Sequence, residues 1–257
     1  WKVTPKLTVT LAVRADHNAN PICRTNCFNL AADQFAELNH DINQPYNQAI
    51  QTGQEHAFRD IEAIAWQPRM GFAWTPFGNQ STAIRGGVGV FSDLFPGVFA
   101  EYFSRNTPGV NSFTIFGQPA DPSLPNSSHA QAVAVNNAFN AAFNNGGTFQ
   151  SITDTLATQG VGFAPPSLSV MSNNVKNPKF IKWNLQFEQA FGSKTSVSLN
   201  YNGNHGRDIF VTNSGINAYC DVASCGAAFP GLPTVALDPR FGFVTQYYNG
   251  GTSNYNG

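Results

Sequence analysis

WQPRMGFAWTPFGNQSTAIRGGVGVF, residues 66–91, has the pattern of a β-hairpin whose two faces differ in chemistry. The first arm alternates Met70, Phe72 and Trp74 with Arg69, Gly71 and Ala73, and the second alternates Ile84, Gly86, Val88 and Val90 with Arg85, Gly87 and Gly89. Successive side chains of a strand point to opposite faces, so one face is largely apolar and the other carries small or cationic residues. Residues 76–80, which include a Pro and a Gly, are expected to form the turn between the arms.

Two kinds of β-protein fit this hairpin. A soluble sandwich buries its apolar face and turns the polar one to water. A membrane barrel does the reverse, with apolar side chains toward lipid and small or polar ones toward the lumen. The arms have about the ~9–11 residues that a tilted strand needs to cross the hydrocarbon layer. The hairpin alone leaves both alternatives open.

The composition of the 257 residues excludes some functions. Charged residues make up 11% of the chain, below the roughly 25% of an ordinary soluble domain. The net charge of −1 gives no field that would attract nucleic acid, so we expect no nucleic-acid partner. No apolar run approaches the ~18 residues of a transmembrane helix, but barrel strands carry a weaker signal in each segment.

Alternation of the same kind returns in residues 7–14, 179–188 and 196–202, and residues 208–212 could extend the last of these strands. The connections at 4–6, 76–80 and 192–194 are short, whereas those at 16–65, 92–177 and 213–252 are long. Strands joined alternately by short turns and long loops are typical of outer-membrane barrels. The sequence therefore predicts an all-β fold, an antiparallel up-and-down transmembrane β-barrel segment. Residues 1–257 would be one partial barrel domain with about five full strands, short turns on one rim and long, partly helical loops on the other.

Helical patterns occur inside the long loops. Residues 128–145 are expected to form a helix, with Ser127 or Ser128 as N-cap and Gly146 as the stop. A second helix is expected over 149–157, and a short one near 30–38.

Three stretches resemble a known family: WKVTPKLTVTLAVR, QPRMGFAWTPFGNQSTAIRGGVGVF and NPKFIKWNLQFEQAFGSKTSVSLNYNGNHGRDIF. Together they look like the barrel of TonB-dependent outer-membrane transporters, and in particular like the Oar-like receptors. The resemblance implies a barrel of about 22 strands around a plug domain. It also implies a bacterial outer-membrane location and coupling to an energy-transducing inner-membrane protein. No part of the chain matches the plug or the coupling segment, so we expect an internal piece of a longer polypeptide.

The function that this resemblance implies is uptake of a bulky nutrient, such as an oligosaccharide, a peptide or a chelate. The expected partners are outer-membrane lipid, the protein's own plug domain, the energy-transducing protein and an unknown ligand. Two other functions stay open: a barrel for surface binding or adhesion, and a passive porin-like channel. No nucleophile-elbow, metalloprotease or dinucleotide motif occurs, so we expect no enzyme activity, no cofactor and no metal.

The four cysteines fall in two of the long loops. Local disulfides Cys23–Cys27 and Cys220–Cys225 are expected because each pair is close in sequence and an extracellular loop is in an oxidising setting. Free thiols and a zinc site are the alternatives.

Two sets of residues are candidates for contact with cargo. One set lies on the polar face of the strands, where it could line the lumen or only solvate the wall: Arg14, Arg69, Arg85, Lys182 and Glu188. The other lies in the longest loop, where aromatic rings could bind a sugar or peptide or merely pack the loop: Phe95, Phe99, Tyr102, Phe103 and Phe113.

The same alternation predicts which side chains face lipid. The expected outward set is Leu11, Met70, Phe72, Ile84, Val88, Leu185 and Leu199, and Asn184, Gln186 and Asn200 should face inward with the arginines. Trp74, Phe77 and Phe191 adjoin short turns, where an aromatic girdle is expected.

Overall fold

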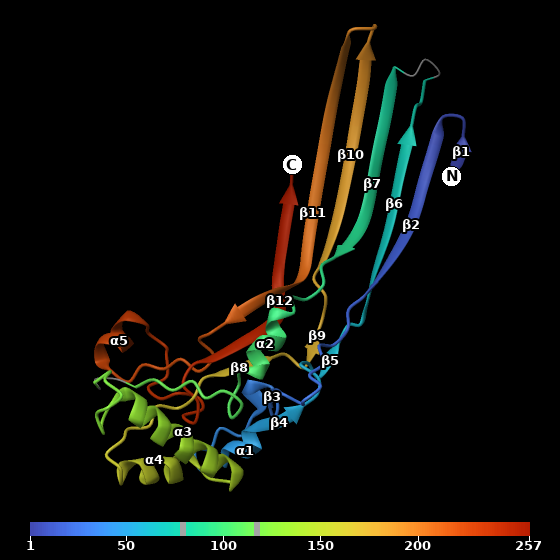
Figure 1. Ribbon diagram of the computed structural model, residues 1–257. Coiled ribbons are helices and arrows are strands. Elements are labelled where there is room, and N and C mark those ends of the chain that lie inside the picture. The colour runs from blue at the N-terminus through green and yellow to red at the C-terminus, as the bar shows by residue number, and fades with distance from the viewer. Residues whose placement is uncertain (78–80, 116–118) are drawn as a thin grey trace.

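The computed structural model describes residues 1–77, 81–115 and 119–257, and its main feature is one eight-stranded sheet (Figure 1). The strand order is β1 (Lys2–Thr4), β2 (Leu7–His17), β6 (Ile64–Trp74), β7 (Thr82–Ser92), β10 (Lys179–Phe191), β11 (Thr195–Asn213), β12 (Val244–Asn256) and β8 (Leu168–Met171). All neighbours are antiparallel except β12 and β8, which are parallel. In the described part of the chain the sheet is open, with β1 and β8 at its edges.

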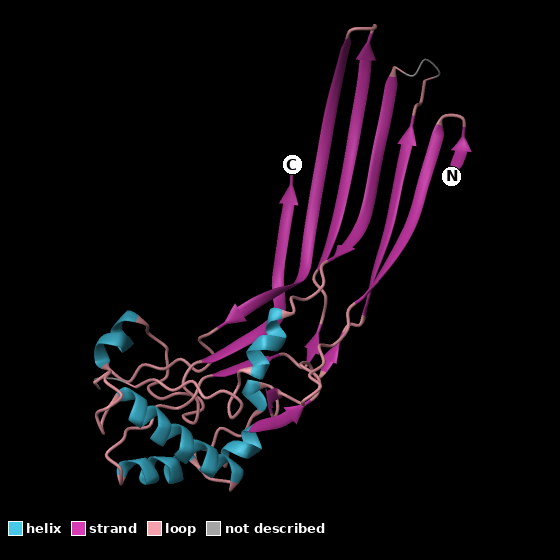
Figure 2. Cartoon of the chain, in the orientation of Figure 1, coloured by secondary structure: helices cyan, strands magenta, loops and turns pink. Residues whose placement is uncertain are grey.

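The two ends of the sheet differ as the connection lengths predict. The turns after β1 and β10 are short and lie at the upper end in Figure 1, and so does the connection after β6. Part of that third turn, residues 78–80, lies outside the described residues. The long connections all lie at the lower end, where they fold into a compact body that we call the loop assembly (Figure 2).

We call the long strands β2, β6, β7, β10, β11 and β12 the wall. It has one more long strand than expected. β12 begins at Val244, inside the stretch 213–252 that we expected to be a loop. Its sequence, VTQYYNGGTSNYN, lacks a regular apolar alternation, and its pairing with β11 holds it in the sheet. β11 continues to Asn213, so the possible extension over 208–212 is present. The strand passes through an irregularity at Asp208, whose φ is 55°, and His205 lies within it.

The loop assembly contains helices and small sheets. Its helices are η1 (Phe35–Glu37), α1 (Tyr46–Ala49), α2 (Val98–Ser104), α3 (Ser128–Asn144), α4 (Phe149–Ala157) and α5 (Ala223–Ala228). β3 (Phe28–Ala31) pairs with β4 (Ile50–Gln54), and β5 (Asp60–Ile61) pairs with β9 (Asn174–Val175). None of the helices in the described ranges is long and apolar enough to cross a membrane.

Local capping explains the two helices that were predicted correctly. The Ser127 side chain accepts a hydrogen bond from the Ala130 amide at the start of α3, and Gly146 follows the end of the helix with a φ of +71°. α4 begins with a reciprocal capping box between Thr148 and Ser151. The helix expected near 30–38 is wrong: this stretch contains the end of β3 and only a single 3-10 turn. Tertiary pairing of β3 with β4 overrides the weak local preference.

Two hydrophobic clusters hold the loop assembly together. The first packs α1, α3 and α4 against β8 and the start of β12, with Val135, Phe139, Ile152, Leu168 and Val244 at its centre. The second packs α2 against β3 and the segment around Phe58, with Phe95, Phe99, Phe103 and Val175 among its members. The loops therefore form a folded body with its own cores.

Candidate functional site

One face of the wall is a continuous apolar surface. Strand register places Leu11, Met70 and Val88 directly opposite one another, and Ile84 opposite Phe187, which in turn lies opposite Leu199. The whole predicted outward set shares this face. Leu11 is 68% exposed and Met70 51% exposed. So large an exposed apolar surface is unfavourable in water and is the expected surface of a barrel in lipid.

Aromatic residues border this face at its turn end. Trp74, Phe77 and Phe191 are all exposed and lie beside the short connections. This is where an interfacial girdle would meet the headgroups. Trp183 lies further along the wall, opposite Gly203, where a Cβ on the glycine would meet the indole at 2.1 Å.

The opposite face is polar and contains all five charged wall candidates. Register places Arg69 opposite Gly89 and Gly89 opposite Lys182, while Arg85 lies opposite Gln186. Two of the candidates pair with each other: Arg85 Nη1 lies 2.6 Å from Glu188 Oε2. The structure brings the set onto one face, and its contact with cargo stays a prediction.

A series of hydrogen-bonded polar side chains lies on the same face, near the end of the wall that carries the long loops. Arg14 Nε lies 2.7 Å from Asp16 Oδ1, and Gln67 Nε2 donates to Asp16 Oδ2 at 2.5 Å. Arg69 Nη2 donates to Gln67 Oε1 at 3.2 Å. Gln67 therefore separates the Arg69 guanidinium from the Asp16 carboxylate.

Between the Arg85–Glu188 pair and the Arg14–Asp16 pair, the polar face has a hollow of about 470 Å³, which we call the wall hollow. Among the residues that line it are Arg69, Gly87, Gly89, Phe91, Lys182, Asn184, Asn202, Asn204 and Tyr255. The guanidinium carbon of Arg69 lies 4.3 Å from the centre of the Phe91 ring, and Lys182 Nζ lies 5.3 Å from it. Cation–ring contacts of this kind hold both side chains over the glycine floor. Sequence reasoning found the charges, but not that both would meet at Phe91.

The loop aromatics pack the loop assembly. Phe95, Phe99 and Phe103 are 6%, 8% and 1% exposed and belong to the second cluster, so their rings present almost no surface to a ligand. Tyr102 stacks on Tyr247 with the rings 5.2 Å apart and 12° from parallel. Phe113 contacts Phe139 and Phe163 in the first cluster. Of the two roles considered for this set, packing is the one that the geometry supports.

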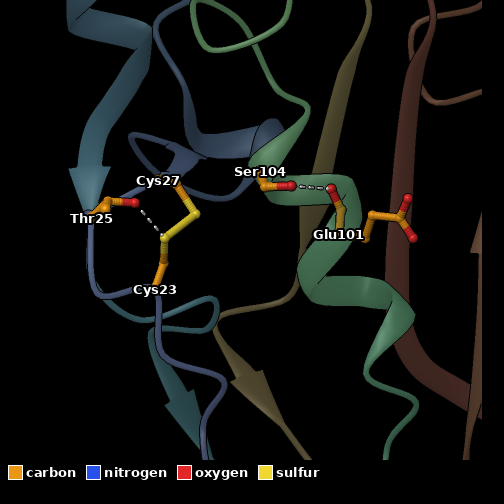
Figure 3. Close-up of a disulfide and its surroundings, with 5 residues drawn as sticks. All are labelled: Cys23, Thr25, Cys27, Glu101 and Ser104. Carbon is orange, nitrogen blue, oxygen red and sulfur yellow. Dashed lines mark hydrogen bonds between the residues drawn. A yellow bond between two sulfur atoms is a disulfide. The ribbon is translucent and has the colours of Figure 1, made fainter.

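Both expected disulfides are present. Cys23–Cys27 and Cys220–Cys225 each join Cα atoms 5.7 Å apart. Figure 3 shows the first bond beside the last turn of α2, where Ser104 Oγ donates to the Glu101 carbonyl at 2.8 Å. Cys23 packs against the second cluster, so the bond fixes the start of the first long loop where it meets the wall.

A buried ion pair in the third long loop also contacts the first long loop. Asp238 is fully buried and Arg240 is 1% exposed, and Arg240 Nη2 lies 2.7 Å from Asp238 Oδ2. Arg240 also donates to the carbonyl of Asn39 at 2.5 Å, and the Tyr46 hydroxyl donates to the Arg240 carbonyl at 2.6 Å. Burial, with the nearby Asp238 carboxylate, raises the pKa of Tyr46 and keeps its hydroxyl a donor.

The contacts of this pair with the first long loop were not predicted because the residues involved are far apart in sequence. Arg240 and Asn39 are separated by 201 residues. The only signal in the sequence is a short charged motif, Asp238-Pro239-Arg240, in an otherwise uncharged stretch.

A polar groove lies where β12 enters the loop assembly. It has a volume of about 450 Å³ and is lined by Gln34, Ser172, Asn173, Asn174, Lys176, Gln246, Tyr248 and Asn249. Asn249 is occupied, since its side chain bonds the backbone of Lys176 and Asp208. Within the described ranges, the side chains of Ser172, Asn174, Lys176, Gln246 and Tyr248 make no hydrogen bond. We call this groove, with its five side chains that make no hydrogen bond in the described structure, the amide groove.

The comparisons with known proteins identify the family. The model of a family described as "Outer membrane beta barrel domain" matches residues 1–257. No curated protein and no solved structure matches the chain. The exposed apolar face, the polar opposite face and the segregation of turns from loops all agree with this match. The chain therefore belongs to the outer membrane beta barrel domain family and lies in the bacterial outer membrane.

Proposed function

We propose that this chain is the wall and loop part of a TonB-dependent transporter of the Oar-like branch, which takes up a bulky nutrient by energy-coupled transport. The nutrient would be an oligosaccharide, a peptide or a chelate. The proposed partners are outer-membrane lipid, the transporter's plug domain and an energy-transducing inner-membrane protein. We propose no enzyme activity for it.

The observation that carries the proposal is the amide groove in a rigid loop assembly. A binding site presents a few polar groups at fixed positions and leaves them free for the ligand. The groove has five such side chains, and the Tyr248 ring is held over Gly250, where a Cβ would lie 2.4 Å from the ring. Amide and hydroxyl groups beside an aromatic ring suit a ligand with many hydroxyl or amide groups.

The loop assembly supports capture rather than free passage. A passive pore needs an open mouth, whereas here the long loops build two hydrophobic cores and two disulfides at the end of the wall. Binding residues are disproportionately found on loops that a rigid scaffold positions.

Uptake by cells that produce the full-length protein tests this function. Cells would receive a panel of radiolabelled oligosaccharides, peptides and metal chelates, with and without the gene for the energy-transducing protein. We expect one class to enter only when that gene is present. Entry without it would indicate a passive channel, and surface binding that never leads to entry would indicate an adhesion barrel.

Substitution in the amide groove tests the site separately. Tyr248→Ala with Gln246→Ala should lower binding of the transported class, while Tyr219→Ala serves as a control, since Tyr219 is an exposed loop tyrosine outside the groove. An equal effect of both changes would assign capture to another surface.

Surface adhesion is the second candidate, and a specific feature favours it. The third long loop exposes several large apolar side chains: Val222, Phe229, Val235 and Phe243. Exposed apolar patches often mark protein interfaces. Adhesion would predict that this loop binds a partner surface while small nutrients are ignored.

A further inference from the structure

We propose that the wall hollow is a subsite for an oxyanion, a carboxylate or phosphate group carried by hydroxylated cargo. The proposal rests on the proposed transport function and names the chemical class that the wall would select. The amide groove would take the neutral part of such a ligand, and the wall hollow its charged group.

The first argument is that neither cation of the wall hollow forms a direct ion pair with a carboxylate among the described residues. Elsewhere on the polar face, Arg85 pairs with Glu188 at 2.6 Å and Arg14 with Asp16 at 2.7 Å. Lys182 has no carboxylate within ion-pair distance among the residues described, and its Nζ lies only near the Phe91 and Phe180 rings.

Arg69 is likewise without a carboxylate in direct contact. Its hydrogen bond goes to the neutral Gln67 amide at 3.2 Å. Its Nε is buried and has no hydrogen-bond partner in the described structure. Buried donors are nearly always satisfied in folded proteins, so a ligand acceptor at this position would remove an energetic cost.

The second argument is the shape of the hollow. Gly87 and Gly89 form its floor, and a Cβ on Gly89 would come within 3.1 Å of both Arg69 Cγ and the Phe91 ring. Any side chain there would displace Arg69 or the Phe91 ring. The glycines therefore leave room above the sheet, while the guanidinium and the ammonium both lie near the Phe91 ring.

The third argument concerns the neutral groups at the rim. Asn204 Oδ1 is a buried acceptor without a partner among the described residues, and Asn184, Asn202 and Tyr255 lie beside it. Asn204 lies opposite Lys182 in the sheet, so an acceptor beside this cation suits a ligand that carries a hydroxyl close to its anionic group. Sugar acids and sugar phosphates have this arrangement.

The general chemistry favours an oxyanion over other ligands. Arg and Lys bind carboxylates and phosphates through charge-assisted hydrogen bonds, which are roughly twice as strong as neutral ones. Rings of Arg and Lys select anions and phosphates in membrane pores. A cationic ligand would be repelled, and a neutral sugar would leave both charges unmatched.

Binding of three related probes to the purified full-length protein tests the proposal. Equilibrium dialysis at low salt would compare radiolabelled glucuronate, glucose 6-phosphate and glucose. We expect both anions to bind more tightly than glucose, with an affinity that falls as salt is added. The stronger of the two anions identifies carboxylate or phosphate as the natural group. Binding of all three probes alike would overturn the proposal.

The variants are Arg69→Gln and Lys182→Gln, with Lys194→Gln as the control. Each of the first two should weaken anion binding about tenfold, since each removes a charged hydrogen-bond partner. Lys194→Gln removes the same charge from the exposed turn after β10, about 30 Å further along that strand than Lys182, so it should leave anion binding unchanged. Equal losses in all three variants would show a general charge effect and would refute the subsite.

Further measurements distinguish a loss of anion binding from misfolding, from a role in stability and from a failure of transport. Lys182 is exposed and makes no side-chain hydrogen bond in the part of the chain described, so Lys182→Gln should fold even if Arg69→Gln does not. If the variants lower the melting temperature of the full-length protein but leave anion binding intact, the two cations contribute to stability and not to ligand binding, and the proposal is wrong. Dialysis needs no energy source, so failed uptake with intact anion binding would count against the transport function alone.

Discussion

At the scale of single residues, an introduced charge should destabilise the protein much more on the apolar face of the wall than on the polar face. Val88 lies on the exposed apolar face, opposite Met70 and Trp183. Val88→Arg should destabilise the folded protein in lipid by about 2–4 kcal/mol if the residue lies near the bilayer midplane. Urea titration of the full-length protein in liposomes would measure this loss.

Thr10→Arg is the matched change on the polar face, where Thr10 lies opposite Gly71. Its cost should be small, because an arginine there does not enter lipid. If both arginines cost the same, the faces have been assigned wrongly.

Asp238 and Arg240 allow a second test at this scale. Arg240→Met leaves the buried Asp238 carboxylate with His40 Nδ1, 3.2 Å away, in place of the guanidinium, and breaking a buried pair costs about 3–5 kcal/mol. The loop assembly should then become sensitive to protease while the wall stays folded. Arg105→Met is the control, since its pair with Glu101 is exposed and contributes little.

At the scale of elements, α3 and α4 are structural parts of the first cluster. Phe139 is fully buried and contacts Tyr46, Phe113 and Phe163. Phe139→Ala should cost about 3–5 kcal/mol of loop-assembly stability, measured by urea-dependent proteolysis. Val133→Ala, on the exposed side of the same helix, should cost far less.

Deletion of residues 130–160 would remove both helices and with them five core side chains: Val135, Phe139, Phe143, Ile152 and Leu156. We expect the whole loop assembly to lose its fold, so lost uptake in this deletion would not identify a capture loop. Normal proteolytic resistance after the deletion would contradict the assignment of these helices to the core.

The strands and helices differ in how well they could be predicted from the sequence. Strands β6, β7 and β10 were predictable because lipid on one side and a polar environment on the other impose alternation on every residue. α3 and α4 were predictable because their caps are local. β12 was not, because neighbours in the sheet fix it more than its own pattern.

The candidate sites depend even more on contacts between distant residues. The charged wall residues were found from their strand positions, but the wall hollow also needs Phe91 and Asn204 from neighbouring strands. The amide groove joins β12 to residues about seventy positions earlier, as the bond from Asn249 to Lys176 shows. No local pattern marks either site.

At the scale of the whole molecule, the wall and the loop assembly should differ in stability. Wall amides between β2 and β11 lie in long antiparallel ladders, and an unpaired backbone group in lipid costs several kcal/mol. Hydrogen exchange on the full-length protein in lipid should therefore show slower exchange in β2, β6, β7 and β10 than in α3, α4 and α5. Uniform protection would mean that the two parts unfold as one unit.

β12 is the element that passes through both parts. Val244 lies in the first cluster, Tyr248 in the amide groove and Tyr255 beside the wall hollow. Tyr255 lies seven positions after Tyr248, which corresponds to about 23 Å of strand. If both sites bind cargo as proposed, this distance separates ligands by length: a monosaccharide would leave one site before it reached the next, whereas a chain longer than this span could occupy both at once.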